Sequence, residues 1–491
     1  MKKIHLAAIV ISAILLLAST SWGLLNVYAG QDTVPDGTVV DGRPIGGLTI
    51  ERAQQELEDV WSRFEEQEVM IQANLTKDAG QSWSLRELGF KVEREPLQRA
   101  LLELREGSLL ERARYRLSFP RQHRIRLAWN RQLFEERIRS QWGWLDLSET
   151  ADAQRRITTD DKVVYRGHRD AYRIDMNALS GQMRTEAASW WRKYAAARSQ
   201  GEEAAPHSEV GKPYTLKLPI TVLQPELTLE KLRAQGVERR ISSHTTDYSA
   251  SPAGRAFNVE ATARTLQNWE LAPGEIFDYG QVIAAAEQQY GFREAPVILN
   301  GEFVPGVGGG ICQVSSTLYQ AALMAGLAIV ERRNHSLPVS YMPLGQDATF
   351  AEGAINFRFR NTTGKHLVIR TETKDRKLTV KLFGTLPTGT QYEIHSRIVQ
   401  TIDPPVVEVA SVKAAPGRPV QLNEGKPGYV VETYRTKLQD GKEISRERIS
   451  RDTYKPTPRL IGIAADEAEG DQETLKSEQE TLLEDGLRLA P

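Results

Sequence analysis

The sequence predicts a multidomain α+β protein that begins with a membrane-inserted helix and ends in a small all-β domain. Three observations support this prediction: an uncharged apolar N-terminus, apolar residues at helical spacing between short strand-like runs, and a strand-rich region with frequent turns towards the C-terminus. The 491 residues correspond to about three domains of roughly 150 residues each. A hydrophobic content of 40% with 26% charged residues is ordinary for folded domains.

Changes in composition divide the chain into six parts. They are an anchor or signal peptide (1–29), a linker (30–43), two α+β modules (44–226), a central α+β domain (240–385), an all-β domain (390–460) and an acidic disordered tail (461–491). The formal net charge of -1 gives no overall attraction to nucleic acid or anionic lipid. We therefore expect no nucleic-acid partner.

The N-terminus has the features of an export signal. Lys2 and Lys3 precede an uncharged run that continues through Gln31, and early lysines favour a cytoplasmic N-terminus. This run can cross ~30 Å of hydrocarbon at roughly 1.5 Å per residue, which predicts an uncleaved single-pass anchor. Residues 27–29 resemble a small-residue cleavage site, so a cleaved signal peptide and a secreted product are the alternative. In both cases the rest of the chain is extracytoplasmic.

The region between the linker and Thr228 contains the order strand-then-helix more than once. One helical face is formed by Ala53, Leu57, Val60 and Trp61. Later, the strand-like residues 163–165 precede a second helical face, formed by Met176, Leu179 and Met183. This order predicts two α+β modules of similar design.

Eight arginines crowd into fewer than 30 positions of this region, with aromatic residues between them. They are Arg105, Arg112, Arg114, Arg116, Arg121, Arg124, Arg126 and Arg131. Outside the membrane, such a run would meet wall polymers or lipid head groups rather than nucleic acid. The alternative interpretation is a solvated helix face whose charge is partly balanced by nearby glutamates.

The central part contains the one cysteine of the chain, Cys312, so no intramolecular disulfide can form. Residues 308–310 are glycines that permit positive φ, and residues 313–325 favour a helix that ends at Gly326. Cys312 is therefore expected at the first turn, where the unpaired N–H groups of a helix lower the pKa of a thiol. The alternative is a small apolar side chain that packs beneath the turn.

His335 and Asp347 follow Cys312 at steps of 23 and 12 positions. This order predicts a catalytic trio in which Cys312 is the nucleophile, His335 the base and Asp347 the residue that orients the base. The same order, with a helix start followed by strands that carry histidine and aspartate, is found in papain-like and transglutaminase-like folds. Candidate oxyanion or substrate contacts are Gly309, Gly310, Gln313 and Ser316. We expect neither a cofactor nor a metal, because no paired ligands and no phosphate loop are present.

The run GEFVPGVGGGICQVSSTLYQAAL at residues 301–323, followed by the motifs at 335–339 and 345–349, resembles the signature of the VanW family. The resemblance covers about a quarter of the chain, roughly Arg255 to Thr385. Members of this family occur in glycopeptide-resistance gene clusters and have no established activity. The resemblance therefore implies a place in the cell envelope and leaves the chemistry open.

The flanking parts also have resemblances. The upstream modules are similar to peptidoglycan-binding modules that commonly precede VanW segments. Residues 425–431, Gly441 and Tyr454 resemble the all-β domain named for its five glycines, although several of those glycines are replaced here. That domain is associated with cell-wall enzymes and with binding of N-acetylated amino sugars, which implies an adhesive or spacing role.

Two function classes follow. The first is a protein that binds or remodels peptidoglycan, with Cys312, His335 and Asp347 forming an amidase, peptidase or transferase site. The second is a non-catalytic scaffold or adhesion protein that holds peptidoglycan, or another cell-wall polymer, near the membrane. The helix-start cysteine favours the enzyme, whereas the surrounding binding modules favour the scaffold.

Overall fold

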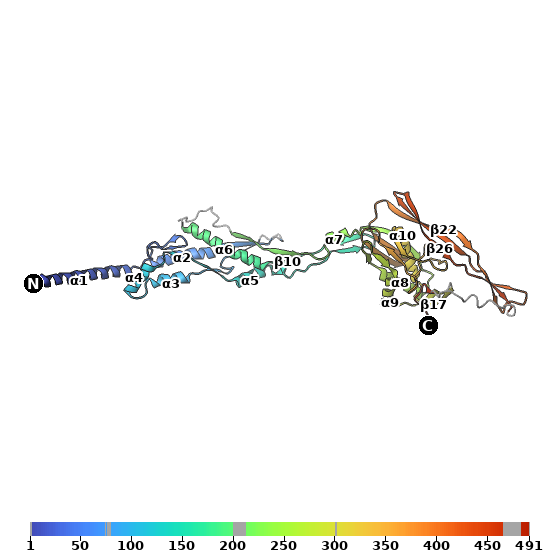
Figure 1. Ribbon diagram of the computed structural model, residues 1–491, viewed down its shortest axis with the longest axis horizontal. Helices are drawn as coiled ribbons and strands as arrows, with labels where there is room; N and C mark the ends of the chain where they lie inside the picture. Colours follow the sequence, from blue (N-terminus) through green and yellow to red (C-terminus); the bar gives the residue numbers. More distant parts are fainter. Residues whose placement is uncertain are drawn as a thin grey trace. The chain divides into compact units, whose positions relative to one another are not determined.

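The computed structural model describes residues 2–73, 75, 80–199, 213–299, 302–464 and 483–490. The chain forms two compact units: an N-terminal unit, Met1–Asp152 with His168–Glu226, and a C-terminal unit, Ala153–Gly167 with Leu227–Pro491 (Figure 1). Residues 200–212 of the region predicted as two α+β modules, and residues 465–482 and 491 of the predicted tail, lie outside the described residues.

The N-terminal unit is a mixture of helices and short strands. Its elements are α1 (Lys2–Ala29), β1 (Val39–Val40), β2 (Arg43–Pro44), α2 (Ile50–Glu65), β3 (Glu68–Gln72), β4 (Gln81–Ser84), β5 (Phe90–Val92), α3 (Glu95–Glu103), α4 (Leu109–Ser118), β6 (Gln122–His123), β7 (Leu127–Trp129), α5 (Arg131–Trp142), η1 (Gly143–Leu145), β10 (Ala171–Ile174), α6 (Met176–Ser199), β11 (Tyr214–Lys217) and β12 (Ile220–Leu223).

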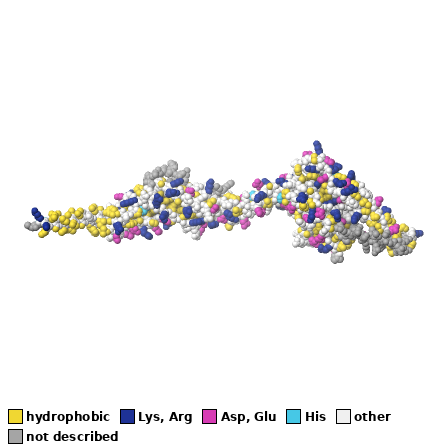
Figure 2. All heavy atoms as spheres, in the orientation of Figure 1, with side chains coloured by type: hydrophobic (Ala, Val, Ile, Leu, Met, Phe, Trp, Pro, Cys, Tyr) yellow, Lys and Arg dark blue, Asp and Glu magenta, His cyan; other side chains and the backbone are white. Residues whose placement is uncertain are grey.

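The apolar run at the N-terminus folds into the 28-residue helix α1. At about 1.5 Å per residue this helix is roughly 42 Å long, which exceeds the ~30 Å of a bilayer core. Its apolar side chains are mostly exposed, and Figure 2 shows them gathered along the helix. Among the described residues, α1 is the one helix that is long and apolar enough to cross a membrane.

The predicted helical faces of this unit are confirmed. Thr49 caps α2 by accepting a hydrogen bond from the backbone N–H of Arg52, and the four predicted face residues of α2 are buried. The face of α6 formed by residues 176, 179 and 183 is buried in the same hydrophobic cluster. These two faces supply much of the apolar surface that stabilises the unit.

The prediction that the second α+β module is one contiguous segment is wrong. Its strand, β9 (Val163–Arg166), pairs with β8 (Gln154–Ile157) in the C-terminal unit, whereas its helix α6 packs in the N-terminal unit. The strand–helix order alone could not reveal this, because the tertiary partner of each element lies elsewhere in the sequence.

Several members of the arginine cluster make contacts inside the N-terminal unit. Arg116 is buried and donates to the backbone oxygen of Thr33 at 2.7 Å and to that of Gln31 at 2.9 Å. Arg105 pairs with Asp32 and Glu51. These contacts give Arg105 and Arg116 a structural role inside the unit, and the buried Arg116 does not fit the solvated helix face of the alternative interpretation.

The C-terminal unit contains the remaining elements. They are β8, β9, α7 (Leu229–Ala234), β13 (Arg239–Asp247), α8 (Ala253–Leu266), β14 (Trp269–Leu271), β15 (Ile276–Asp278), α9 (Tyr279–Tyr290), β16 (Glu294–Leu299), β17 (Glu302–Val307), α10 (Ile311–Met324), β18 (Ala328–Glu331), β19 (Arg358–Arg360), β20 (Leu367–Lys374), β21 (Lys377–Gly384), β22 (Thr390–Ile402), β23 (Val406–Ala410), β24 (Val420–Asn423), β25 (Gly428–Gln439), β26 (Lys442–Tyr454), β27 (Arg459–Ile463), β28 (Leu483–Glu484) and β29 (Arg488–Leu489).

A four-stranded antiparallel sheet in the order β13-β21-β20-β14 supports the central helix α10. The hairpin between β20 and β21 turns at Asp375 and Arg376, whose φ values of 51° and 57° match the twist of the flanking strands. Helix α10 packs on β13 and β21, and its residues 311–323 are all buried. A helix buried on every side places its first turn deep inside the domain.

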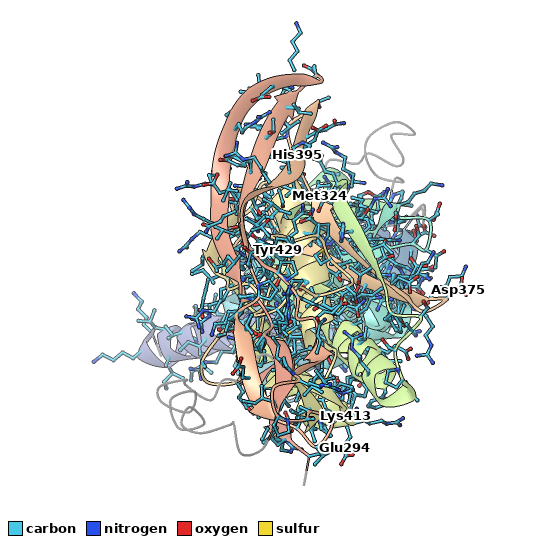
Figure 3. The ribbon with its side chains drawn as sticks, turned by 90° about the vertical axis from the view of Figure 1, so that its right-hand side faces the viewer. Glu294, Met324, Asp375, His395, Lys413 and Tyr429 are labelled. Atoms are coloured by element: carbon cyan, nitrogen blue, oxygen red, sulfur yellow. The ribbon has the colours of Figure 1, made fainter. Side chains whose placement is uncertain are left out.

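The C-terminal all-β region forms two three-stranded sheets, β22-β25-β26 and β23-β27-β24. The strand-rich character predicted for this region is confirmed, with strands at Val406–Ala410, Gly428–Gln439 and Lys442–Tyr454. Asp440 lies in the turn between the last two and has a φ of 51°. Figure 3 shows the long strand β22, which carries His395, beside α10, which ends at Met324. Arg435 on β25 donates to the backbone oxygen of Leu327 at 2.7 Å, which fastens this region to the central domain.

Residues 483–490 of the predicted disordered tail are ordered. They form β28 and β29, which pair with β16 and β17 in one four-stranded sheet. The acidic composition of the region suggested disorder, because it offers little apolar surface to bury. Leu487 nevertheless packs into the core that contains α10, so a short stretch of the tail has an apolar anchor.

Candidate functional site

The first turn of α10 is presented by a glycine loop, as the sequence predicted. Gly308 and Gly310 adopt φ values of 98° and 105°, a region that side chains with a Cβ rarely occupy. A Cβ atom on Gly309 would lie 2.3 Å from the backbone oxygen of Pro296, so glycine is also required there for space. The helix begins at Ile311, which makes Cys312 its second residue.

Cys312 is fully buried in the hydrophobic cluster around α10. Its Sγ accepts a hydrogen bond from the backbone N–H of Phe350 at 3.0 Å and lies 3.5 Å from the backbone oxygen of the same residue. Burial raises the pKa of the Cys312 thiol well above its ordinary value, and the negative charge of Asp485 raises it further. The expectation that the helix start lowers this pKa is therefore wrong.

The predicted base and its orienting carboxylate are in contact. His335 Nδ1 lies 2.6 Å from Asp347 Oδ2, and the same oxygen accepts the backbone N–H of His335 at 2.7 Å. Burial lowers the pKa of His335, but the hydrogen bond and charge of Asp347 outweigh it, so the net direction is upward. For Asp347, burial raises the pKa, but contacts with His335 and Arg332 outweigh it and lower the pKa to about 2.

The segment that carries this pair differs from the predicted layout. His335 and Asp347 lie between β18 and β19, and neither is part of a strand. The papain-like and transglutaminase-like comparison required both on strands, and that feature of the comparison is wrong. The segment is held instead by side chains of α10, because Ser316 Oγ accepts the backbone N–H of Ala348 at 3.0 Å and donates to its oxygen at 3.2 Å.

Cys312, the predicted nucleophile, and His335, the predicted base, are not hydrogen-bonded to each other. Within the described ranges, His335 Nε2 is buried and has no hydrogen-bond partner, and Cys312 Sγ makes polar contacts with the backbone of Phe350 and of Asp485. The three residues thus share one buried neighbourhood around the start of α10 without forming the relay that general-base catalysis needs. Their catalytic roles stay predictions.

A carboxylate from the tail occupies the start of α10. Asp485 Oδ1 accepts the backbone N–H of Cys312 at 2.7 Å and that of Gly310 at 3.1 Å. We call these two N–H groups the carboxylate site. An oxyanion held by two amides at a helix start is the arrangement that stabilises negative charge in acyl-transfer chemistry. One of its donors is the backbone N–H of Gly310, whose predicted contact with a substrate or oxyanion stays a prediction.

Gln313 does not contribute to the carboxylate site. Its amide donates to the backbone oxygen of Asp247 at 2.9 Å, and its carbonyl accepts Arg255 Nη1 at 2.7 Å. Gly309 contributes its backbone oxygen, which accepts the side-chain amide of Asn258 at 3.0 Å. Gln313 and Gly309 therefore stabilise the loop and helix rather than the bound anion.

Sequence reasoning missed the two acids of the tail. Besides Asp485, Glu484 accepts the backbone N–H of Ser336 at 3.0 Å and its hydroxyl at 3.1 Å, next to His335. No signal near Cys312 could have found these residues, which are distant in sequence. In the part of the chain that the structure describes, no three His, Cys, Asp or Glu side chains are placed to hold a metal ion.

Residues 254–383 match the family model described as VanW like protein, and residues 395–463 match the model of the G5 domain. Over 173 residues the chain is 34% identical to the uncharacterized protein YoaR of Bacillus subtilis (strain 168), which covers 35% of this chain and 57% of that protein. Over 153 residues it is 28% identical to the vancomycin B-type resistance protein VanW of Enterococcus faecalis (strain ATCC 700802 / V583), covering 30% and 56%. The match thus spans about half the length of each curated relative.

Among solved structures, the G5 domain of an IgA1 protease aligns with 25% identity over 16% of this chain and 95% of that chain, with a TM-score of 0.12.

Proposed function

Because the chain carries a VanW-like domain followed by a G5 domain, we propose that it is a membrane-tethered envelope protein that binds peptidoglycan or another cell-wall polymer. In this proposal α1 remains as a single-pass anchor, with its lysines on the cytoplasmic side and both units outside. Cleavage after residue 29 would instead release the same binding protein. The name of the enterococcal relative, a vancomycin resistance protein, is consistent with a role at the cell wall.

The observation that carries the proposal is the carboxylate site at the start of α10. It holds one oxygen of Asp485 with two backbone amides, in a place from which water is excluded. Peptides of the cell wall carry free carboxylates, and a buried pair of amides at a helix start recognises such a group by charge and by hydrogen bonding. The G5 domain adds a second surface for the same polymer.

Binding is favoured over catalysis by the state of Cys312. A nucleophilic thiol must be ionised and accessible, whereas this one is buried, has a raised pKa and is not bonded to His335. A binding protein needs neither property.

A cysteine-dependent acyl transfer is the second candidate, and the pair of His335 and Asp347 at 2.6 Å favours it. The thiol of Cys312 would add to the carbonyl carbon of a peptide bond while His335 takes its proton. The carboxylate site would hold the resulting oxyanion, and the proton would pass to the departing amine, leaving an acyl thioester for water or a second amine to resolve. This chemistry requires that Asp485 first leave the site.

Co-sedimentation with purified sacculi tests the first proposal. The full chain in detergent should be retained with the sacculi, and retention should fall when soluble peptidoglycan fragments are added as competitor. An unrelated detergent-solubilised protein of similar net charge is the control. Retention no higher than that of the control would refute wall binding. Release of peptide or amine from sacculi by the wild type, absent in Cys312→Ala, would establish the second candidate instead.

A further inference from the structure

The tail segment, residues 483–490, binds the central domain as an extended peptide would. β28 pairs antiparallel with β16, placing Glu484 opposite Ile298, and β29 pairs antiparallel with β17, placing Leu489 opposite Gly306. Backbone pairing of this kind adds a strand to a sheet edge and depends little on side-chain identity. Recognition of particular residues must therefore come from the part between the two strands.

That middle part fits its surroundings closely. Asp485 adopts a φ of 55°, unusual for a residue other than glycine, and this turn directs its carboxylate to the amides of Gly310 and Cys312. A Cβ atom on Gly486 would lie 2.3 Å from Cγ1 of Val297, so a larger residue cannot replace it without a shift. Leu487 is 9% exposed and packs into the core around α10.

A second observation at the same place indicates a ligand. His335 is 0% exposed, and among the described residues its Nε2 has no partner, which is costly for a buried polar atom. The charges of Asp485 and Glu484 both act on this ring. The two tail carboxylates therefore act on His335 by their charge but accept no hydrogen bond from its Nε2. A ligand that bonded to Nε2 as well would fit this site better than the tail does.

We infer that the tail segment is an internal competitor that occupies the binding site for an extended acidic peptide, and that such a peptide displaces it. The ligand pairs its backbone with β16 or β17 and places a carboxylate on the amides of Gly310 and Cys312. The inference rests on the proposed wall-binding function and narrows its ligand to the peptide part of the polymer rather than the glycan.

Occupation by the tail also accounts for the sealed cysteine. The carboxylate of Asp485 takes the two amides that would stabilise a thiolate, and Leu487 belongs to the cluster that covers Cys312. Displacement of the tail takes the carboxylate of Asp485 off the two amides and Leu487 out of the cluster around Cys312. The reactivity of Cys312 therefore reports whether the tail is bound, without ambiguity since the chain contains no other cysteine.

The test uses the full chain in detergent and compares wild type, Asp485→Asn and Gly486→Val. Asp485→Asn removes the charge, and Gly486→Val blocks docking while keeping Asp485. Asp278→Asn is the matched control, because Asp278 caps α9 by accepting the backbone N–H of Gly280 at 2.9 Å but lies outside the tail. The first readout is the rate at which iodoacetamide alkylates Cys312.

Loss of the charged hydrogen bonds in Asp485→Asn and loss of tail docking in Gly486→Val should each speed alkylation by about 10-fold or more, and the control should stay near wild type. The second readout is binding of a fluorescein-labelled peptide with the sequence of residues 483–490. This peptide should bind the tail variants at least about 10-fold more tightly than the wild type, and a version with asparagine in place of its aspartate should bind more weakly.

Alkylation of both tail variants within about twofold of wild type would overturn the inference, since each substitution removes a contact worth more than that. Equal binding of the two peptides would overturn the role of the carboxylate. Sacculus retention of the same proteins separates the two proposals. Peptide binding without sacculus retention refutes the wall-binding function alone, whereas retention with a tail that cannot be displaced refutes the internal competitor alone.

Discussion

Asp347 lies where the VanW-like domain meets the G5 domain, and replacing it with asparagine tests how much this junction depends on one buried charge. The carboxylate is 1% exposed. It accepts hydrogen bonds from the backbone and ring of His335, from the hydroxyl of Tyr454 on β26 and from Arg332 at 3.4 Å. Asparagine keeps the size of the side chain but removes its charge and one of its two acceptor oxygens.

Breaking a buried ion pair by removing one partner costs about 3–5 kcal/mol. The lower end applies here, because Arg332 keeps Asp452 at 2.6 Å and is not left with an uncompensated charge. We expect Asp347→Asn to lower the free energy of unfolding by about 3 kcal/mol. For a unit of this size that corresponds to a fall of roughly 6–12 °C in Tm.

Urea titration of the full chain in detergent, followed by circular dichroism, measures this change. Tyr454→Phe is the matched control, because it keeps the charge of Asp347 while removing the hydroxyl that donates to this carboxylate and accepts the backbone N–H of Gly345 at 2.6 Å. It should cost about 2 kcal/mol. If Asp347→Asn proves no more destabilising than Tyr454→Phe, the charge of Asp347 contributes no more than the two hydrogen bonds of this hydroxyl. This result would refute the inference that the charge of Asp347 stabilises the junction of the VanW-like and G5 domains.

Three further outcomes are expected. The pKa of Asp347 falls from 3.8 to about 2 on folding, so its stabilising contribution is complete above pH 3.8 and is lost as the pH drops towards 2. Urea titrations should therefore show that wild type loses more stability over this window than Asp347→Asn does. The pKa of His335 is raised above 6.5, so its contribution is complete below that pH and is lost as the pH rises through the folded value. The stability difference between wild type and His335→Gln should therefore shrink as the pH rises above 6.5. Gly310→Ala should lower the unfolding free energy by about 1–3 kcal/mol through strain at positive φ and a contact of 2.8 Å with Arg255, and by more than Gly353→Ala, which has a φ of 72° and no neighbour within 4 Å.

The part of the site that depends on neighbouring residues could be predicted from the sequence. Glycines at 308–310 and the apolar stripe after them placed the helix start within two residues of Ile311, because turn geometry and helix propensity act over a few positions. The contact between His335 and Asp347 was also predicted, from the order cysteine, histidine, aspartate, although both residues lie in a loop rather than on the expected strands.

The part that depends on distant residues could not be predicted. Asp485 reaches the N–H of Cys312 across 173 positions, and nothing in the composition of an acidic tail marks one of its aspartates as buried. The prediction that the helix start lowers the pKa of the Cys312 thiol was wrong for the same reason. The helix start does favour an anion, but the anion bound there is the tail carboxylate rather than the sulfur.

Variants of Asp347 and of Asp485 therefore test different properties of the site. Asp347 orients His335, and it also fastens Tyr454 and, through Arg332, the strand that carries Asp452. Any loss of function in an Asp347 variant mixes chemistry with the stability of the domain junction. Asp485 contacts the start of α10 from a short segment outside the residues that match the G5 domain. Substitution at Asp485 thus changes the carboxylate site while Asp347 and its partners keep their own side chains, so its effect on binding is easier to separate from the stability of the domain junction.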